Sequence, residues 1–255
     1  MHKLKNGLAS FFKEYALLMR SVHPFITAMF FISIIGMNLL ANKSINTGLD
    51  WLALDCGILL SWMCFMAMDI TTKRYGLKAA NILSVTALLV NLLLALIFFI
   101  ASIIPGEWSQ SYVPGSEEIL NNAFNETFKG TWYIIVGSSV AFIVSAIVNN
   151  VFNWGIGKMF KKNPDGFVAF ACRTYVSTAI GQFIDNILFA IIVSRIFFGW
   201  TWVQCVTCAA TGMIAELLFE IVFSPFGYRF CKYLDKYKVG EEYLAYQRQK
   251  QEAKS

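Results

Sequence analysis

The sequence predicts an all-α protein, a polytopic membrane helical bundle with six transmembrane helices. The chain has 255 residues, of which 57% are hydrophobic and only 15% are charged. Its mean hydropathy of +0.56 is too high for an ordinary soluble domain. Six apolar stretches recur along the chain, each close to the roughly 20 residues that a spanning helix needs. These observations favour one compact membrane domain.

The six apolar stretches define the predicted spans. The third is longer than a bilayer requires, so we expect it to tilt or project. Residues 23–228 should form the transmembrane domain, and residues 229–255 a charged, solvated tail. The predicted spans are residues 24–41, 51–70, 77–104, 131–155, 167–194 and 200–224.

Residues 1–22 show a different pattern. Apolar side chains recur at helical spacing and basic side chains lie beside them, which is typical of an amphipathic helix at the membrane interface. Because no continuous apolar core is present, we do not expect a cleaved signal peptide. The apolar positions are Leu4, Leu8, Phe11, Phe12, Tyr15, Leu18 and Met19, and the basic ones are Lys3, Lys5, Lys13 and Arg20.

Basic residues gather after the second, fourth and sixth spans, whereas the connection after the third span is acidic. Cytoplasmic loops carry an excess of Lys and Arg. We therefore predict that both termini are cytoplasmic, and we attribute the net charge of +5 to topology and lipid attraction, not to nucleic acid. The basic residues are Lys73, Arg74, Lys78, Lys158, Lys161, Lys162, Arg229, Lys232, Lys236 and Lys238.

The fifth span carries the most informative pattern, a polar stripe on an apolar helix. Arg173, Ser177, Gly181 and Asp185 are each four residues apart and share one helix face. A charged residue in hydrocarbon costs about 2.5–3.5 kcal/mol on insertion scales. The stripe should therefore face a protein interior or a wet cavity. Gln182 and Asn186 lie beside it.

The fourth span has a similar stripe. Ser145 and Asn149 repeat the spacing of Gly181 and Asp185, and small residues four apart let two helices approach closely. We expect these helices to pack together. Asn149 and Asp185 should then lie at similar heights and present an amide and a carboxylate to a shared cavity.

Other polar residues require an explanation. Asp69 should form a charged cluster with Lys73 and Arg74 at the cytoplasmic end of its helix. Asn38 should form a hydrogen bond within the bundle. Glu216 and Glu220 lie four apart on one face, so one of them is expected to be protonated or paired with a cation. Cys205 and Cys208 form an isolated C-x-x-C, which we interpret as apolar helix residues.

Motifs of catalysis and cofactor binding are absent. We find no nucleotide-binding loop, nucleophile elbow or metal-binding histidine pair. The sequence thus predicts no enzyme, no cofactor and no metal site.

Four motifs make the chain resemble the queuosine precursor transporter family, also called the vitamin uptake transporter or YhhQ-like family. The resemblance covers about residues 30–230, and the fifth-span motif is its most specific part. The motifs are Asn38-Leu-Leu-Ala-Asn-Lys43, Asp69-Ile-Thr-Thr-Lys-Arg-Tyr75-Gly76, Arg173…Ser177-Thr178…Gly181-Gln182…Asp185, and Glu220…Ser224-Pro225…Tyr228.

The resemblance implies a six-helix bacterial inner-membrane importer of 7-deazaguanine bases, the precursors of a tRNA nucleoside. It also implies a fold similar to the substrate-binding components of energy-coupling-factor transporters. The chain departs from the family pattern at three positions. Many relatives carry Glu in place of Lys73, Lys in place of Glu216 and Asp in place of Asn149. The first two differences suggest a charge exchange between helices.

Deazaguanine chemistry fits these residues independently. A carboxylate accepts the adjacent N–H and NH2 groups of a guanine edge, and an amide bonds its carbonyl oxygen and ring nitrogen. An aromatic ring, with Phe183, Phe189 and Trp154 as candidates, would stack on the base. The predicted substrate-binding residues are Asp185, Gln182, Asn149, Arg173, Asn38, Asp69, Glu216 and Glu220.

Alternative interpretations remain open. The chain could be a substrate-binding subunit that needs separate ATPase components, for a vitamin-like molecule. A membrane enzyme acting on lipid would need an interfacial catalytic set that the sequence lacks. The predicted partners are a small deazapurine substrate and membrane lipids, without nucleic acid; a homo-oligomer stays open.

Overall fold

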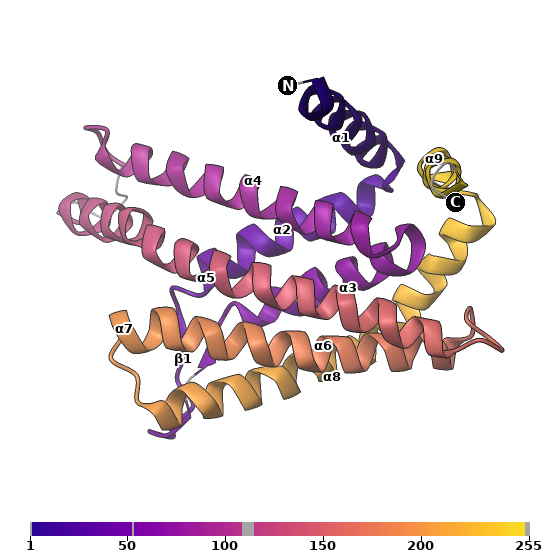
Figure 1. The fold of residues 1–255 in the computed structure, drawn as a ribbon. Helices are drawn as coiled ribbons and strands as arrows, with labels where there is room; N and C mark the ends of the chain where they lie inside the picture. The colour runs from indigo at the N-terminus through magenta and orange to yellow at the C-terminus, as the bar shows by residue number, and fades with distance from the viewer. Residues whose placement is uncertain (1, 53, 109–114, 253–255) are drawn as a thin grey trace.

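The computed structural model describes residues 2–52, 54–108 and 115–252, and most of them are helical (Figure 1). The all-α prediction is confirmed. Within those ranges the strands are β1 (Ser44–Ile45) and β2 (Leu54–Asp55), which pair antiparallel. The helices are α1 (His2–Ser21), α2 (Pro24–Leu40), α3 (Ile58–Tyr75), α4 (Leu77–Ile103), α5 (Glu117–Met159), α6 (Phe167–Phe189), η1 (Ala190–Ser194), α7 (Arg195–Phe197), α8 (Trp202–Lys236) and α9 (Glu241–Glu252).

Two helices exceed their predicted spans. α5 begins at Glu117, well before the predicted start at residue 131, and α8 continues through Pro225 to Lys236. A proline removes one helical hydrogen bond, but the helix can absorb that loss when neighbouring residues pack against it. The third span, predicted to be long, is α4 with 27 residues.

Among the described residues, four helical rods are long and apolar enough to cross a membrane: α4, α5, the α6–α7 rod (Phe167–Phe197) and α8. The pair α1 and α2, bent by 100° near Pro24, counts as a fifth at most. α2 has only 17 residues, and α3 carries Asp69, Lys73 and Arg74 near its end. The chain is therefore a multi-pass membrane protein, and six spans stay a prediction.

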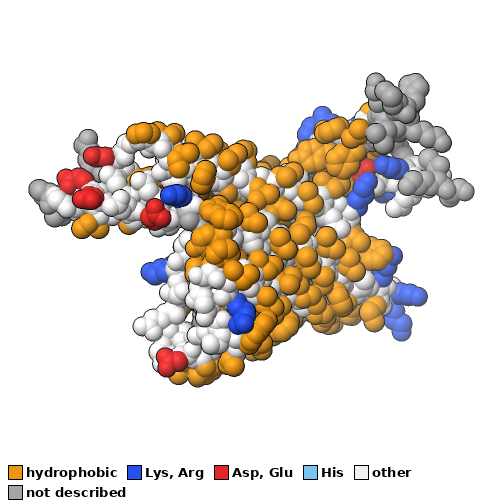
Figure 2. All heavy atoms as spheres, turned by 60° about the vertical axis from the view of Figure 1, so that its left-hand side comes forward, with side chains coloured by type: hydrophobic (Ala, Val, Ile, Leu, Met, Phe, Trp, Pro, Cys, Tyr) orange, Lys and Arg blue, Asp and Glu red, His pale blue; other side chains and the backbone are white. Residues whose placement is uncertain are grey.

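The two ends of the bundle differ (Figure 1). We call the end with β1, β2 and α7 the hairpin end, and the end with α9 and residues 160–166 the basic end. Because α3, α5 and α8 all finish at the basic end, the Lys and Arg residues near their C-terminal ends gather there as expected. Which membrane face each end occupies stays a prediction. Figure 2 shows hydrophobic side chains across the middle of the visible face and charged groups toward its extremities.

The C-terminal tail differs from the expected solvated helix. α9 packs on α1, and Tyr243 of α9 is 0% exposed. Glu14 of α1, 1% exposed, accepts hydrogen bonds from Lys250 at 2.7 Å and Gln247 at 2.8 Å, and also pairs with Lys78 of α4. Side chains of residues 2–7, including Lys3, Leu4 and Lys5 of the amphipathic pattern, lie outside the described residues.

α5 and α6 form a close antiparallel pair, as their small-residue stripes predict. Gly181 makes the approach possible, because a Cβ there would lie 3.0 Å from the Asn149 Cβ and 2.7 Å from the Phe65 ring. The antiparallel direction sets Asp185 beside Ser145 instead of Asn149. The expected common height of Asn149 and Asp185 is thus wrong by about one helical turn, since α6 runs opposite to α5.

Candidate functional site

A small polar cavity lies at the hairpin end of the bundle, between α2, α3, α5, α6 and α8. Its volume is about 50 Å³, and Ala41, Ile58 and Phe189 contribute apolar surface. Its polar lining is Asn38, Asp55, Ser61, Ser138, Asp185, Asn186 and Glu216. We call this the hairpin-end cavity.

Two hydrogen-bonded carboxylates, Asp185 and Glu216, line the hairpin-end cavity. Asp185 accepts a hydrogen bond from the Ser145 hydroxyl at 2.8 Å. Glu216 accepts one from the Asn186 amide at 3.2 Å and another from the Ser61 hydroxyl. The site therefore combines acceptors from α6 and α8 with a neighbouring amide, which suits a ligand that presents several N–H donors.

A glycine on α8 makes room for the Asn186 amide. A Cβ at Gly212 would lie 2.8 Å from the Asn186 Nδ2 atom. Any larger residue at this position would push the amide away from Glu216. Close packing of α6 on α8 is therefore part of the site geometry.

Asp55 of β2 lines the same cavity from the loop side. Burial raises the pKa of this carboxyl to about 6, although the Gly57 amide donates a 2.7 Å hydrogen bond that opposes the rise. The charge of the cavity is therefore expected to change in the mildly acidic range.

A second polar group lies deeper, where α3, α5 and α6 meet. Asp69 accepts a 2.9 Å hydrogen bond from the Asn149 amide and weaker ones from Ser177 and Thr178 at 3.4 Å. Arg173 donates from Nε and Nη2 to Asn153 Oδ1, at 2.8 and 2.5 Å. We call these residues the central polar cluster: Asp69, Asn149, Asn153, Arg173, Ser177 and Thr178.

Arg173 and Asp69 do not pair directly. Asn153 binds the guanidinium and also donates to Ser177 at 3.3 Å, so it connects Arg173 to the hydroxyl beside Asp69. The guanidinium occupies a space left by Gly157, where a Cβ would lie 2.8 Å from its Nη1 atom. Arg173 and Asp69 thus belong to one network, with an amide between them.

Lys73 and Glu216 do not meet either. Lys73 forms a 2.8 Å ion pair with Asp165 at the basic end, whereas Glu216 lies in the hairpin-end cavity. Both positions carry the opposite charge to the family pattern. In this protein each has its own partner: Lys73 pairs with Asp165, and Glu216 accepts from Asn186.

In the described part of the chain, Gln182 and Glu220 form no hydrogen bond to either polar group. Each is fully buried, and across residues 2–52, 54–108 and 115–252 neither side chain has a hydrogen-bond partner. The eight predicted site residues thus divide into three sets. Asn38, Asp185 and Glu216 line the cavity, Asp69, Asn149 and Arg173 form the central polar cluster, and Gln182 and Glu220 are buried without partners.

Sequence reasoning did not assign Asp55, Ser61 or Asn153 to a site. Asn153 follows Asn149 by four residues, so the stripe on α5 could have been extended to include it. Asp55 and Ser61 lie within the second predicted span, where no periodic polar pattern marks them. Of the three stacking candidates, Phe189 lines the cavity, whereas Trp154 lies under the Lys158 ammonium group and Phe183 is exposed.

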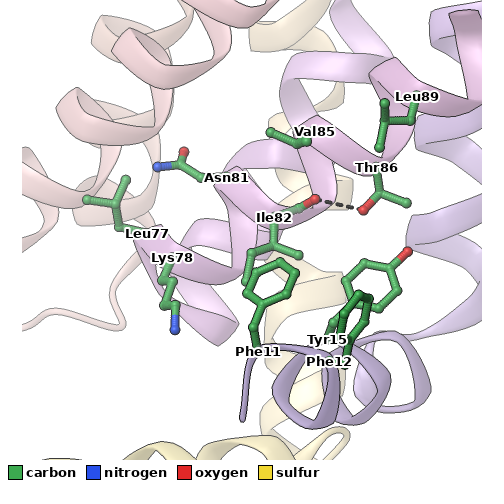
Figure 3. Close-up of a pocket in the computed structure, with 10 residues that line it drawn as sticks. All are labelled: Phe11, Phe12, Tyr15, Leu77, Lys78, Asn81, Ile82, Val85, Thr86 and Leu89. Carbon is green, nitrogen blue, oxygen red and sulfur yellow. Dashed lines mark hydrogen bonds between the residues drawn. The ribbon is translucent and has the colours of Figure 1, made fainter. Parts of the chain in front are cut away.

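A much larger cavity lies elsewhere, between α1 and α4, and measures about 570 Å³ (Figure 3). Phe11, Phe12, Tyr15 and apolar residues of α4 line most of it. Three of its polar side chains have partners: Lys78 pairs with Glu14, Asn81 accepts from Asn150, and Thr86 donates to the Ile82 carbonyl. This groove offers no carboxylate for a polar ligand, so the hairpin-end cavity is the stronger candidate. Among the described residues, no group of three His, Cys, Asp or Glu could hold a metal ion.

Comparison with known protein families assigns the chain to one of them. The model of a family described as putative vitamin uptake transporters matches residues 55–230, which include most of the hairpin-end cavity and the whole central polar cluster. The chain belongs to this family. No curated protein and no solved structure matches it. Membership in the vitamin uptake transporter family confirms the resemblance drawn from the four motifs, and it indicates a transport protein.

Proposed function

We propose that the chain imports queuosine precursors, which are 7-deazaguanine bases, and that the hairpin end faces the outside of a bacterial inner membrane. Family membership supports a vitamin-type transporter. The observation that carries the choice of substrate is the pair of carboxylates, Asp185 and Glu216, in one cavity beside the Asn186 amide.

A guanine-like edge complements this arrangement. Its ring N–H and amino group are adjacent donors, and a carboxylate such as Asp185 accepts both in a charge-assisted pair. The amides of Asn38 and Asn186 would then bond the carbonyl oxygen and ring nitrogen. Phe189, which lines the same cavity, supplies an aromatic surface for the base.

The cavity has to widen before it can hold a base. Ligand sites measure roughly 300–1,000 Å³, whereas this cavity measures about 50 Å³. The proposal therefore includes a rearrangement that moves the helices lining the cavity apart. The π-helical turn η1 directly follows Phe189, and such turns occur frequently at functional sites.

Thermal unfolding of the purified protein with a ligand panel tests the substrate class. We expect 7-cyano-7-deazaguanine, 7-aminomethyl-7-deazaguanine or queuine to raise the unfolding temperature, with about 2.7 kcal/mol of stabilisation at a ligand concentration of 100 Kd. Adenine is the matched control, because it lacks the adjacent N–H and amino donors of guanine. Equal stabilisation by adenine, or none by any deazaguanine, contradicts the proposal.

Uptake measured with this chain alone in a heterologous cell separates a stand-alone importer from a subunit that needs ATPase components. We expect uptake without added subunits. Binding of a deazaguanine without uptake would favour the subunit interpretation.

A further inference from the structure

Glu220 lies on α8 one helical turn beyond Glu216, on the side away from the hairpin-end cavity. Its side chain is 0% exposed, and in the part of the chain that the structure describes neither carboxyl oxygen has a hydrogen-bond partner. Glu216, four residues earlier, lines the cavity and is hydrogen-bonded. One carboxyl is thus accessible to the cavity and the next is sealed from it.

Among the described residues, the helices that pack on α8 bring no cation to Glu220. α8 packs mainly on α3 and α6. From α3, the charged group whose field reaches Glu220 is Asp69, which has the same sign. From α6, Arg173 bonds Asn153 and Tyr175 bonds Ser224 at 2.6 Å, so neither serves Glu220.

An ionised carboxylate without a partner costs several kilocalories per mole in such a site, and a second buried negative charge adds to the cost. The neutral acid avoids most of it. Buried chains of Asp and Glu are a known means of moving protons through membrane transporters. Glu216, Glu220 and Asp69 form such a series, from the hairpin-end cavity to the central polar cluster.

We propose that Glu220 is the proton-carrying coupling site of this transporter, placed between the cavity carboxylate Glu216 and the buried carboxylate Asp69. In the transfer step, the Glu220 acid releases one H⁺ and becomes a carboxylate, and the Asp69 carboxylate receives that H⁺ and becomes an acid. A proton arriving through Glu216 restores Glu220. The inference rests on the proposed transport function, and its ligand is the proton itself.

Infrared spectroscopy tests the protonated state without any substrate. The difference spectrum between the wild type and Glu220→Gln in lipid vesicles at neutral pH should show loss of the carbonyl band of a protonated carboxylic acid. Glu118→Gln, which changes an exposed glutamate of α5, should alter only the carboxylate band. Loss of a carboxylate band in Glu220→Gln would overturn the inference. If Glu220→Gln does not fold, Glu220→Asp should shift the acid band, and an unchanged band would also overturn it.

Transport in vesicles tests the coupling. With the outside made acidic, the wild type should accumulate a labelled deazaguanine, whereas Glu220→Gln should only exchange it to the equilibrium level. Glu220→Asp, which keeps the acid, should retain accumulation. Full accumulation by Glu220→Gln, or uptake that follows a Na⁺ gradient and ignores the pH gradient, overturns the coupling while leaving the substrate assignment intact. Absence of deazaguanine uptake by the wild type contradicts the proposed function and leaves the infrared result to decide on Glu220.

Discussion

Asn149 donates its side-chain amide to a carboxylate oxygen of Asp69 across 2.9 Å, at the junction of α5 and α3. Both side chains are buried, and the hydrogen bond from the Asn149 amide is the shortest one that Asp69 accepts. This contact joins residues 80 positions apart in the chain and fixes α3 against the α5–α6 pair.

Asn149→Ala should destabilise the protein, because it leaves the buried Asp69 carboxyl with only weak donors. We expect a loss of about 1–3 kcal/mol. Denaturant unfolding in detergent would measure it. The control is Asn122→Ala, at an exposed position of the same helix. Equal stability of the two variants would show that the Asn149 contact contributes little.

Asp185→Asn should weaken binding of a deazaguanine roughly tenfold to a hundredfold, since it turns one acceptor into a donor that faces substrate N–H groups. The Ser145 hydroxyl can still donate to the remaining amide oxygen, so folded yield should hardly change. Ligand titration by thermal shift measures the effect. Asp50→Asn, an exposed loop carboxylate at the same end, is the control. A folded Asp185→Asn variant with wild-type affinity would place the substrate elsewhere.

Periodicity predicted much of this fold and one part of the site. Residues four apart mark one helix face, so the stripe from Arg173 to Asp185 and its packing on α5 followed from spacing alone. Spacing does not give the relative direction or register of two helices. Asn149 therefore came to lie opposite Gly181, and Asp185 opposite Ser145.

Partners of charged residues were harder to predict, because they depend on tertiary contacts. Asn153 binds Arg173 and separates it from Asp69. Lys73 pairs with Asp165, which lies in the loop between the fourth and fifth predicted spans. The docking of α9 was also missed. Its composition is polar, and the residues that it contacts on α1 are distant in the chain: Lys250 donates to Glu14, more than 200 positions away.

Gly181→Ala should separate α5 from α6. Its Cβ would lie 2.7 Å from the Phe65 ring and 3.0 Å from the Asn149 Cβ, and both neighbours belong to packed helices. Overpacking of this kind costs typically 1–3 kcal/mol. Gly155→Ala on α5 is a matched control, because nothing lies within 4 Å of its Cβ. A smaller loss of stability at position 181 than at position 155 would contradict the packing argument.

Cysteine-accessibility labelling in intact cells tests the orientation. In a background without the six native cysteines, a cysteine replacing Glu118 should react from outside, and one replacing Lys161 only after the membrane is permeabilised. We expect this because Lys and Arg residues gather at the basic end, and cytoplasmic loops carry an excess of them. Labelling of position 161 from outside would invert the proposed topology.

Acid should release α9 from α1. Burial alone would raise the pKa of Glu14, but hydrogen bonds from Lys250, Lys78 and Gln247 outweigh it and lower the pKa from 4.5 to about 2. A lowered folded-state pKa means that Glu14 contributes stability above its unfolded pKa of 4.5, and that this contribution is lost as pH falls toward about 2. The protection of Glu241–Glu252 against hydrogen exchange, relative to the intrinsic rate at each pH, should therefore fall over this range.

Glu14→Gln should give the fast exchange of α9 already at neutral pH, because the two lysines lose their charged partner while the amide can still accept from Gln247. Glu242→Gln, an exposed position of α9 itself, should leave exchange at neutral pH unchanged. Slow exchange in Glu14→Gln at neutral pH would show that apolar burial around Tyr243, and not the Glu14 charge, holds the tail on α1.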